Sequence, residues 1–236
     1  MEVLGIIPAR GGSKSIPLKN IRNFNGKPLL SWTIIDAKKS NVNRILVSTD
    51  SSEIAEVARQ EGAEIPFIRP ESISKDTDGI EPILVHALNF LKEKEGYCPD
   101  YVALLLPTAP FRKVTDINDA ISLGKRKMPD SVVSVSRAIA NHNPHWMLVK
   151  NQDGSVTQFS GGLLKDMKVR RQDIPDVYIK NDFIFLIRPE NLYDENPALY
   201  GDNVELMIAE DDRCDVDINS EKDWKIAEVL FRDFSA

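Results

Sequence analysis

A basic loop near the start of the chain holds the residues best suited to bind a polyphosphate. Arg10, Lys14 and Lys19 place three cations in the loop that follows an apolar run. Gly11 and Gly12 free the backbone to turn tightly and to direct N–H groups at an anion. The alternative is a solvated basic turn between a strand and a helix. Positive charge gathered in a chain of formal net charge −6 favours phosphate binding.

A pair of acidic residues near the other end of the chain could hold a metal ion. Asp215 and Asp217 alternate in a segment predicted to be extended, so both carboxylates fall on one face. Adjacent carboxylates repel unless a cation lies between them, and Mg²⁺ beside a polyphosphate is held by carboxylate and phosphate oxygens. The alternative is a solvated strand end before a helix, where acids suit the helix dipole. The spacing alone leaves both readings open.

Other polar residues follow apolar runs, where the ligands of open α/β sheets bind. Ser51 or Ser52 is expected to cap the next helix, and Asp50 is expected to serve as a cap rather than to bind substrate. Arg69 and Arg112 could each be solvated loop residues. Arg170 and Arg171 are interpreted as a solvated basic turn. A substrate that carries a carboxylate would favour a binding role instead, because arginine binds carboxylates bidentately.

These candidates need a scaffold, and the first half of the chain predicts alternating strands and helices. Apolar and β-branched runs predict buried strands at 3–9, 44–50, 65–68, 101–106 and 131–135. Amphipathic stretches predict helices at 28–37, 52–62, 83–91 and 116–127. This alternation implies a three-layer α/β/α sandwich around a mainly parallel, Rossmann-like sheet.

The helical pattern stops between residues 141 and 177. Two short strands at 146–149 and 156–159, joined by Asp153-Gly154, read as a hairpin. An inserted hairpin must bury its apolar face, and a partner subunit is a candidate surface. Strands return at 183–187 and 204–208, and a last helix begins at Ser220. We expect one domain, 1–236, with 141–177 as a hairpin and dimerisation insertion.

The bulk composition narrows the class of protein. With 236 residues, 42% hydrophobic and 28% charged, the chain is typical of a soluble globular domain. Its acidic balance argues against nucleic acid as the main partner. Its apolar runs are too short to span a membrane, and Met1 leads straight into a strand rather than a leader. Two isolated cysteines favour a reducing cytoplasm and show no zinc spacing.

With these residues laid out, the chain resembles the acylneuraminate cytidylyltransferases, the CMP-sialic acid and CMP-legionaminic acid synthetases. The block at 7–20 is highly specific to that family. The later matches are individually weak but follow the family's order: 47–50, Arg69-Pro70 with Asp76-Thr77, 86–88, 107–112, 171–173 with Tyr178 and Asn181, and the region of Asp217. The resemblance therefore covers nearly the whole chain.

The resemblance implies a cytoplasmic homodimer that uses CTP and Mg²⁺ to convert a nine-carbon 2-keto sugar acid into its CMP-sugar, releasing pyrophosphate. It implies catalytic roles for Arg10, Lys14 and Asp217, and metal binding by Asp215 and Asp217. The residues that would bind the nucleotide are Ala9, Arg10, Gly11, Gly12, Ser13, Lys19, Asn20 and Arg69. Those that would face the sugar acid are Arg171, Gln172, Tyr178 and Asn181. No residue stands out as a general base.

Several positions depart from the family pattern. Asn219 stands where a second carboxylate is usual, and Leu106 replaces a glutamine expected to contact the sugar. Asp182-Phe183 and Asp78-Gly79 also differ from the common residues. These departures leave the acceptor open among sialic, legionaminic, KDN and Kdo types. A non-catalytic nucleotide-binding module is the alternative from a different class.

Overall fold

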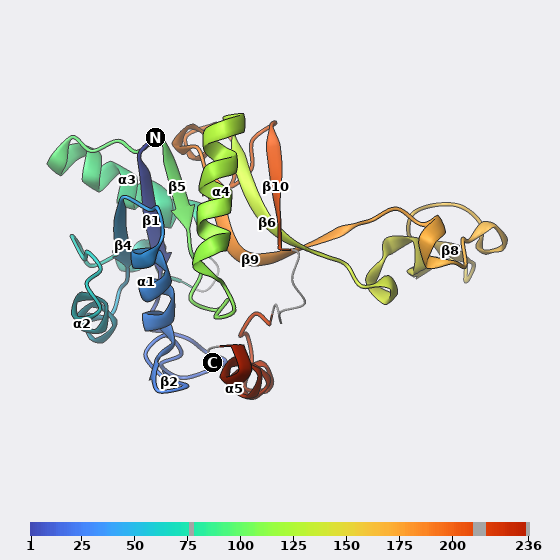
Figure 1. Ribbon diagram of the computed structural model, residues 1–236, viewed down its shortest axis with the longest axis horizontal. Helices are drawn as coiled ribbons and strands as arrows, with labels where there is room; N and C mark the ends of the chain where they lie inside the picture. The colour runs from blue at the N-terminus through green and yellow to red at the C-terminus, as the bar shows by residue number, and fades with distance from the viewer. Residues whose placement is uncertain (76–77, 210–215, 235–236) are drawn as a thin grey trace.

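A six-stranded sheet forms the centre of the computed structural model, which describes residues 1–75, 78–209 and 216–234 (Figure 1). The strands lie in the order β10-β6-β9-β5-β1-β4. Their bounds are β1 Val3–Pro8, β4 Arg44–Ser48, β5 Tyr101–Leu104, β6 Ser131–Arg137, β9 Tyr178–Ile187 and β10 Val204–Ala209. The predicted α/β architecture is confirmed.

The sheet is mostly parallel, with one strand reversed. β1 pairs in parallel with β4 and β5, and β10 with β6. β9 runs antiparallel to both β5 and β6, with Leu104 opposite Phe185. Parallel strands end at the same edge of the sheet, so the loops after β1, β4 and β5 meet there.

Helices cover both faces because side chains alternate along each strand. Ile7 and Ala103 pack on the face covered by α1, α2 and α4, whereas Ile6 and Leu104 pack on the face covered by α3. The bounds are α1 Leu29–Lys39, α2 Ser52–Gln60, α3 Glu81–Glu95 and α4 Val114–Lys127. The helices predicted in these regions are confirmed.

A separate aromatic cluster fixes the C-terminal helix α5 (Glu221–Phe234) beside the small β2–β3 pair (Asn23–Phe24 and Lys27–Pro28). The rings of Trp224 and Phe231 lie 5.4 and 5.0 Å from that of Phe24. Such edge-to-face contacts add to the burial of apolar area. The cluster anchors the helix that follows Asp217 to the loop that follows β1.

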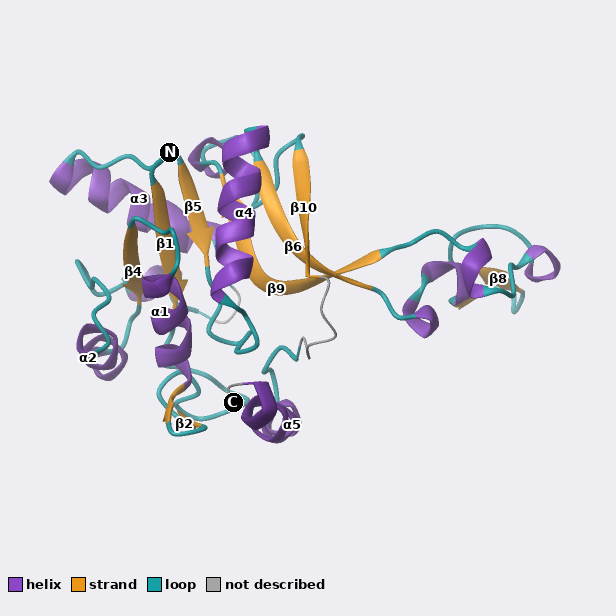
Figure 2. Cartoon of the chain, viewed as in Figure 1, coloured by secondary structure: helices purple, strands orange, loops and turns teal. Residues whose placement is uncertain are grey.

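An arm leaves the body between β6 and β9 and projects to one side (Figures 1 and 2). The backbone N–H of Ala138 donates to Val177 O at its base. The arm carries the antiparallel pair β7 (Leu148–Lys150) and β8 (Val156–Gln158), which matches the predicted hairpin. Between these elements lie 3-10 turns, Arg171–Asp173 among them.

The strand predicted at 65–68 is wrong. An isolated bridge joins Leu46 to Glu64, and the next backbone hydrogen bond to this neighbour runs from Arg69 N–H to Thr49 O, so residues 65–68 form no ladder. Pro66 has no N–H to donate to a neighbouring strand, so an apolar run alone does not extend the sheet there.

None of the helices in the part of the chain that the structure describes is long and apolar enough to cross a membrane.

The pH dependence of stability provides a test of the burial of Asp36 on α1. Burial raises the pKa of Asp36 from 3.8 to about 6, although Arg112 and Lys39 oppose the shift. Between those pH values the folded protein binds more protons than the unfolded chain, so the free energy of unfolding falls as the pH rises from about 4 to 6.

Asp36→Asn should remove this fall, which amounts to at most about 3 kcal/mol for a shift of about two pKa units. Urea unfolding at several pH values between 4 and 7 measures it. Asp119→Asn, at an exposed position on α4, is the matched control and should keep the wild-type pH dependence. An identical pH dependence in Asp36→Asn and wild type would contradict the assignment.

Candidate active site

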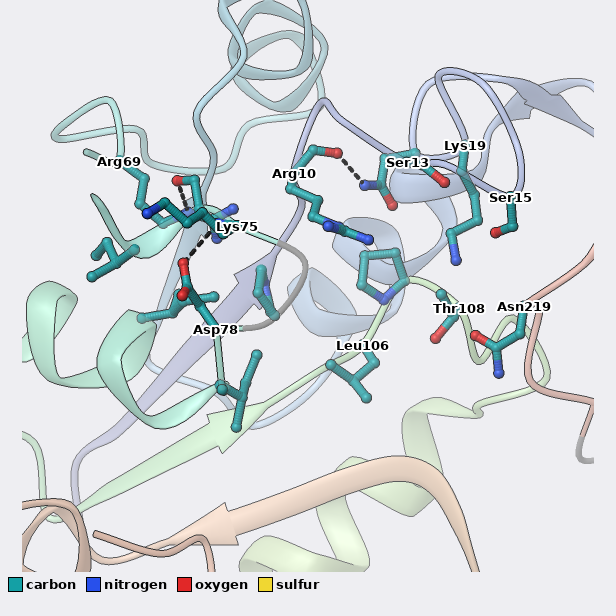
Figure 3. A pocket seen from close by; sticks show the side chains of 18 residues that line it. Arg10, Ser13, Ser15, Lys19, Arg69, Lys75, Asp78, Leu106, Thr108 and Asn219 are labelled. Atoms are coloured by element: carbon teal, nitrogen blue, oxygen red, sulfur yellow. Dashed lines mark hydrogen bonds between the residues drawn. The ribbon is translucent and has the colours of Figure 1, made fainter. Parts of the chain in front are cut away.

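A pocket of about 380 Å³ opens where β1 and β5 end (Figure 3). One wall comes from the basic loop and the segment 106–108, and the opposite wall from residues 73–83. The lining residues are Pro8, Arg10, Ser13, Ser15, Lys19, Asn20, Arg69, Ile73, Ser74, Lys75, Asp78, Gly79, Ile80, Ile83, Leu106, Pro107, Thr108 and Asn219. Four cationic residues, Arg10 and Lys19 from the basic loop and Arg69 and Lys75 from the segment after α2, thus line one cavity.

The basic loop is held at both ends by side-chain hydrogen bonds. Gly11 N–H donates to Asp50 Oδ1 at 2.9 Å, and Asn20 Nδ2 donates to Arg10 O at 3.0 Å. A Cβ on Gly11 would lie 3.0 Å from Ser51, so close packing explains this glycine. The left-handed residue of the loop is Leu18, with φ of 52°, rather than either glycine. The loop is therefore held in place before any ligand binds.

Asp50 does not have the role that the sequence suggested. Ser51, one of the two serines expected to cap α2, is the cap and accepts from Ile54 N–H at 3.3 Å. Asp50 holds the loop through Gly11 and lies 3.8 Å from Arg69 Nη2. The carboxylate links two parts of the site that the chain separates.

Arg69 is buried rather than solvated, with 2% of the residue exposed. Its guanidinium donates from Nε to Ser74 Oγ at 3.0 Å and from Nη1 to Ser48 O at 3.3 Å. Burial lowers the pKa of Arg69, and Asp50 opposes the shift. A charge held this firmly can meet a ligand without losing further conformational freedom.

Lys19 and Asp217 approach each other from opposite ends of the chain. Lys19 Nζ donates to Ile218 O at 2.9 Å, and Ile218 N–H donates to Thr108 O at 2.9 Å. Burial lowers the pKa of Lys19, and the charge of Asp217 opposes the shift. Asp217 Oδ2 accepts from Asn219 Nδ2 at 2.5 Å. No described residue donates a hydrogen bond to the buried Oδ1 of Asp217.

Other nucleotide candidates lie around the pocket rather than in its lining. Ala9 is buried and donates its N–H to Ser48 O. Gly12 is exposed, with open space where a Cβ would stand. Lys14 is exposed on the same loop and does not line the pocket. Asp215 lies outside the described residues.

The four sugar candidates lie in two separate places. Asn181 is buried on β9, where it donates from Nδ2 to Ser136 Oγ and accepts from Phe183 N–H. Tyr178 begins β9 and is half-buried. Arg171 and Gln172 are exposed on the arm, which projects away from the body (Figure 1). One chain alone therefore does not bring all four to the pocket.

Sequence reasoning missed most of the wall at 73–83 and the burial of Arg112. Ser74 and Asp78 reach the pocket on a loop whose own hydrogen bonds include Lys75 N–H to Asp78 Oδ2 at 2.7 Å (Figure 3). The sequence signals for this loop were its place after Arg69 and the family resemblance, which covers Asp76-Thr77 and from which Asp78-Gly79 departs. Across residues 1–75, 78–209 and 216–234, no group of three His, Cys, Asp or Glu side chains could hold a metal ion.

The arrangement can bind a polyanion. Arg10, Lys19, Arg69 and Lys75 line the cavity together with the carboxylate of Asp78. Asp217 is not part of the lining, but it offers a buried oxygen near Lys19. Cations fixed before the substrate arrives stabilise phosphate charge at little cost in reorganisation.

Comparison with known proteins agrees with this chemistry. Residues 4–201 match the family described as Cytidylyltransferase. The chain is 33% identical over 231 residues to a CMP-N,N'-diacetyllegionaminic acid synthase of Legionella pneumophila, covering 98% of this chain and 96% of the relative. It is 31% identical to an N-acylneuraminate cytidylyltransferase of Escherichia coli, over 96% of this chain and 51% of the relative.

A solved structure of CMP-2-keto-3-deoxy-manno-octonic acid synthetase in complex with CTP shares the fold, with a TM-score of 0.71, 15% identity and 99% of each chain covered. The chain belongs to the cytidylyltransferase family and is a CTP-dependent nucleotidyltransferase.

Proposed function

We propose that this protein transfers CMP from CTP to the anomeric hydroxyl of a nonulosonic, sialic-acid-like sugar acid. The hydroxyl oxygen forms a bond to the α-phosphorus and releases its proton to solvent. The bond from the α-phosphorus to the oxygen that bridges the α- and β-phosphates breaks, and that oxygen leaves with pyrophosphate. The observation that carries the proposal is the pocket bearing Arg10, Lys19 and Arg69 in a chain similar over 98% of its length to a CMP-legionaminic acid synthase.

The basic loop would bind the triphosphate. Phosphoryl and nucleotidyl transfers depend mainly on positioning and on charge neutralisation at the phosphates. Arg10 would stabilise the leaving pyrophosphate, with Lys14 assisting from the exposed part of the loop. Lys19, Asn20 and Ser13 would hold the nucleotide, and Arg69 would contact it from the opposite wall.

The donor set around Asp217 fits a magnesium ion. Oδ1 of Asp217 is buried without a described donor, and Asn219 lies beside it with a further side-chain oxygen. One carboxylate together with phosphate oxygens is a common way to hold Mg²⁺. Asp217 would hold it, with Asp215 as the second carboxylate assigned from the sequence. A bound Mg²⁺ would neutralise charge on the α-phosphate.

The sugar acid would bind on the β9 side of the pocket. Leu106 makes this part of the wall apolar, while Tyr178 and Asn181 lie on the first half of β9. Arg171 would bind the acceptor's carboxylate, and Gln172 would contact its polar groups. Because both residues lie on the arm, we propose that they reach the sugar across a dimer interface.

We propose that the arm mediates this homodimer. Large apolar side chains remain exposed along it, among them Ile139, Leu148, Phe159, Leu163 and Val169. Apolar side chains gathered on an extended segment are typical of a surface that is covered in the assembly. We also place the protein in the cytoplasm, because its two cysteines are too few for a disulfide framework, as expected in a reducing compartment.

Phe159→Asp should convert the dimer into a monomer, because it places a charge where an apolar side chain, 63% exposed in one chain, would be buried. Sedimentation velocity gives the oligomeric state. Val229→Asp on α5, where the residue is 62% exposed, is the matched control and should leave the dimer intact. A monomeric wild-type protein, or a dimer unchanged by Phe159→Asp, would contradict the role of the arm.

The substrate proposal is tested with each of the four nucleoside triphosphates, Mg²⁺ and a panel of sugar acids. Pyrophosphate should form only with CTP and a nonulosonic acid. The panel should include N-acetylneuraminic acid, a legionaminic acid, KDN and Kdo. Preference for Kdo or for another triphosphate would contradict the proposal. Calorimetric binding of CTP without pyrophosphate from any acceptor would identify a non-catalytic nucleotide-binding module.

A further inference from the structure

Arg112 lies beneath the pocket wall and is almost completely buried, at 2% exposed. Its guanidinium donates to three different elements. Nη2 donates to Leu106 O at 2.7 Å, Nη1 to Thr33 Oγ1 on α1 at 3.2 Å, and Nε to Phe183 O on β9. A buried charge must be hydrogen-bonded and offset by opposite charge to be tolerated.

Three carboxyl groups offset this charge. They belong to Asp36 on α1, Asp116 on α4 and Asp182 on β9. Burial lowers the pKa of Arg112 to about 10, which leaves the guanidinium protonated at neutral pH. The guanidinium of Arg112 therefore interacts with α1, α4 and β9, which lie far apart in the sequence.

A short series of hydrogen bonds connects Arg112 to the site. Leu106, whose carbonyl it holds, begins the pocket wall that continues to Thr108. Thr108 O accepts from Ile218 N–H, and Ile218 O accepts from Lys19 Nζ. Ile218 lies between Asp217 and Asn219, so the position of the wall sets the position of both. Figure 3 shows the side chains of Thr108 and Asn219 close together.

We propose that Arg112 is a positioning residue for nucleotidyl transfer. Its planar guanidinium fixes the wall at 106–108 against α1 and β9, and through Thr108 it aligns the segment that carries Asp217. The inference rests on the proposed function, because it requires Asp217 and Lys19 to act on bound CTP. Lysine keeps the charge, but its ammonium group cannot reproduce a planar guanidinium that donates to three acceptors in different directions.

Arg188 provides a matched control for a purely structural role. It follows β9 at the opposite edge of the sheet and also donates to three oxygens, Pro129 O at 3.1 Å, Tyr101 Oη at 3.3 Å and Met128 O at 3.0 Å. Arg188 does not line the pocket. Replacing either arginine by lysine should therefore lower stability, but only the change at Arg112 should alter the chemistry.

The first experiment compares Arg112→Lys, Arg188→Lys and wild type by their melting temperatures and by kcat and KM for CTP. The kinetics are measured well below the melting temperature of every variant. Both variants should melt earlier. Arg112→Lys should lower kcat about tenfold or more with little change in KM, because small misplacements of reacting groups reduce the rate strongly. Equal kcat in the two variants would overturn the positioning role. If Arg112→Lys does not fold, Thr33→Val should lower kcat about threefold, and an unchanged kcat would overturn the role.

The second experiment combines Arg112→Lys with Asp217→Asn. If Arg112 acts through Asp217, the double variant should have nearly the kcat of Asp217→Asn alone. Fully additive losses would overturn the proposal. Wild-type protein that releases no pyrophosphate from CTP with any acceptor would instead contradict the proposed function and this role together. Active wild type with an unaffected Arg112→Lys would remove only the positioning role.

Discussion

Arg10→Ala should lower turnover with CTP and the sugar acid by about a hundredfold or more while the protein stays folded. Arg10 faces the pocket from the loop that Asp50 and Asn20 hold in place. The backbone that directs its guanidinium toward the pocket is therefore held in place, and negative charge would grow there on the leaving pyrophosphate. Loss of one such contact leaves that charge poorly stabilised in the transition state.

Steady-state kinetics of pyrophosphate release measures the effect, together with thermal unfolding to confirm the fold. The matched control is Arg59→Ala on α2. The Arg59 side chain is 51% exposed, and its Nη1 lies 3.9 Å from Glu56 Oε2 in a surface ion pair. This control should retain wild-type turnover. Near-normal turnover in Arg10→Ala would remove Arg10 from the mechanism.

Asp217→Asn should reduce turnover by a similar factor, about a hundredfold. The amide keeps the shape of the side chain but removes the charge that would hold Mg²⁺ beside the phosphates. The variant should also need a higher Mg²⁺ concentration for half-maximal activity, a shift that a change in folding alone would not produce.

The comparison is a Mg²⁺ titration of pyrophosphate release, with Asp119→Asn on α4 as the control at an exposed aspartate. The control should follow the wild-type titration. An unchanged Mg²⁺ requirement and turnover in Asp217→Asn would exclude Asp217 as the metal ligand.

Local sequence patterns predicted the sheet, its helices and the basic loop, because each depends on short periodicities and on turn residues. The run at 65–68 shows the limit of that approach, since an apolar stretch becomes a strand only if a neighbour accepts its backbone. Strand β9 was predicted from Phe183 onward. Residues 178–182 belong to the strand because the base of the arm pairs with β6.

The site was harder to predict where burial depends on distant elements. Arg112 is a loop residue by sequence, but α1, β9 and the wall at Leu106 enclose it together. Asp50 precedes a helix and was expected to cap it. Its carboxylate instead accepts a hydrogen bond from the N–H of Gly11, 39 residues away. Arg171 and Gln172 lie on an arm whose direction no local pattern encodes.

The most direct test of the account is mass spectrometry of the product formed from CTP, Mg²⁺ and a nonulosonic acid. Wild-type protein should yield the CMP-linked sugar acid and pyrophosphate in equal amounts, and Arg10→Ala should yield both about a hundredfold more slowly. Failure of the wild type to form a CMP-linked sugar from any nonulosonic acid, although CTP binds, would contradict the proposed function.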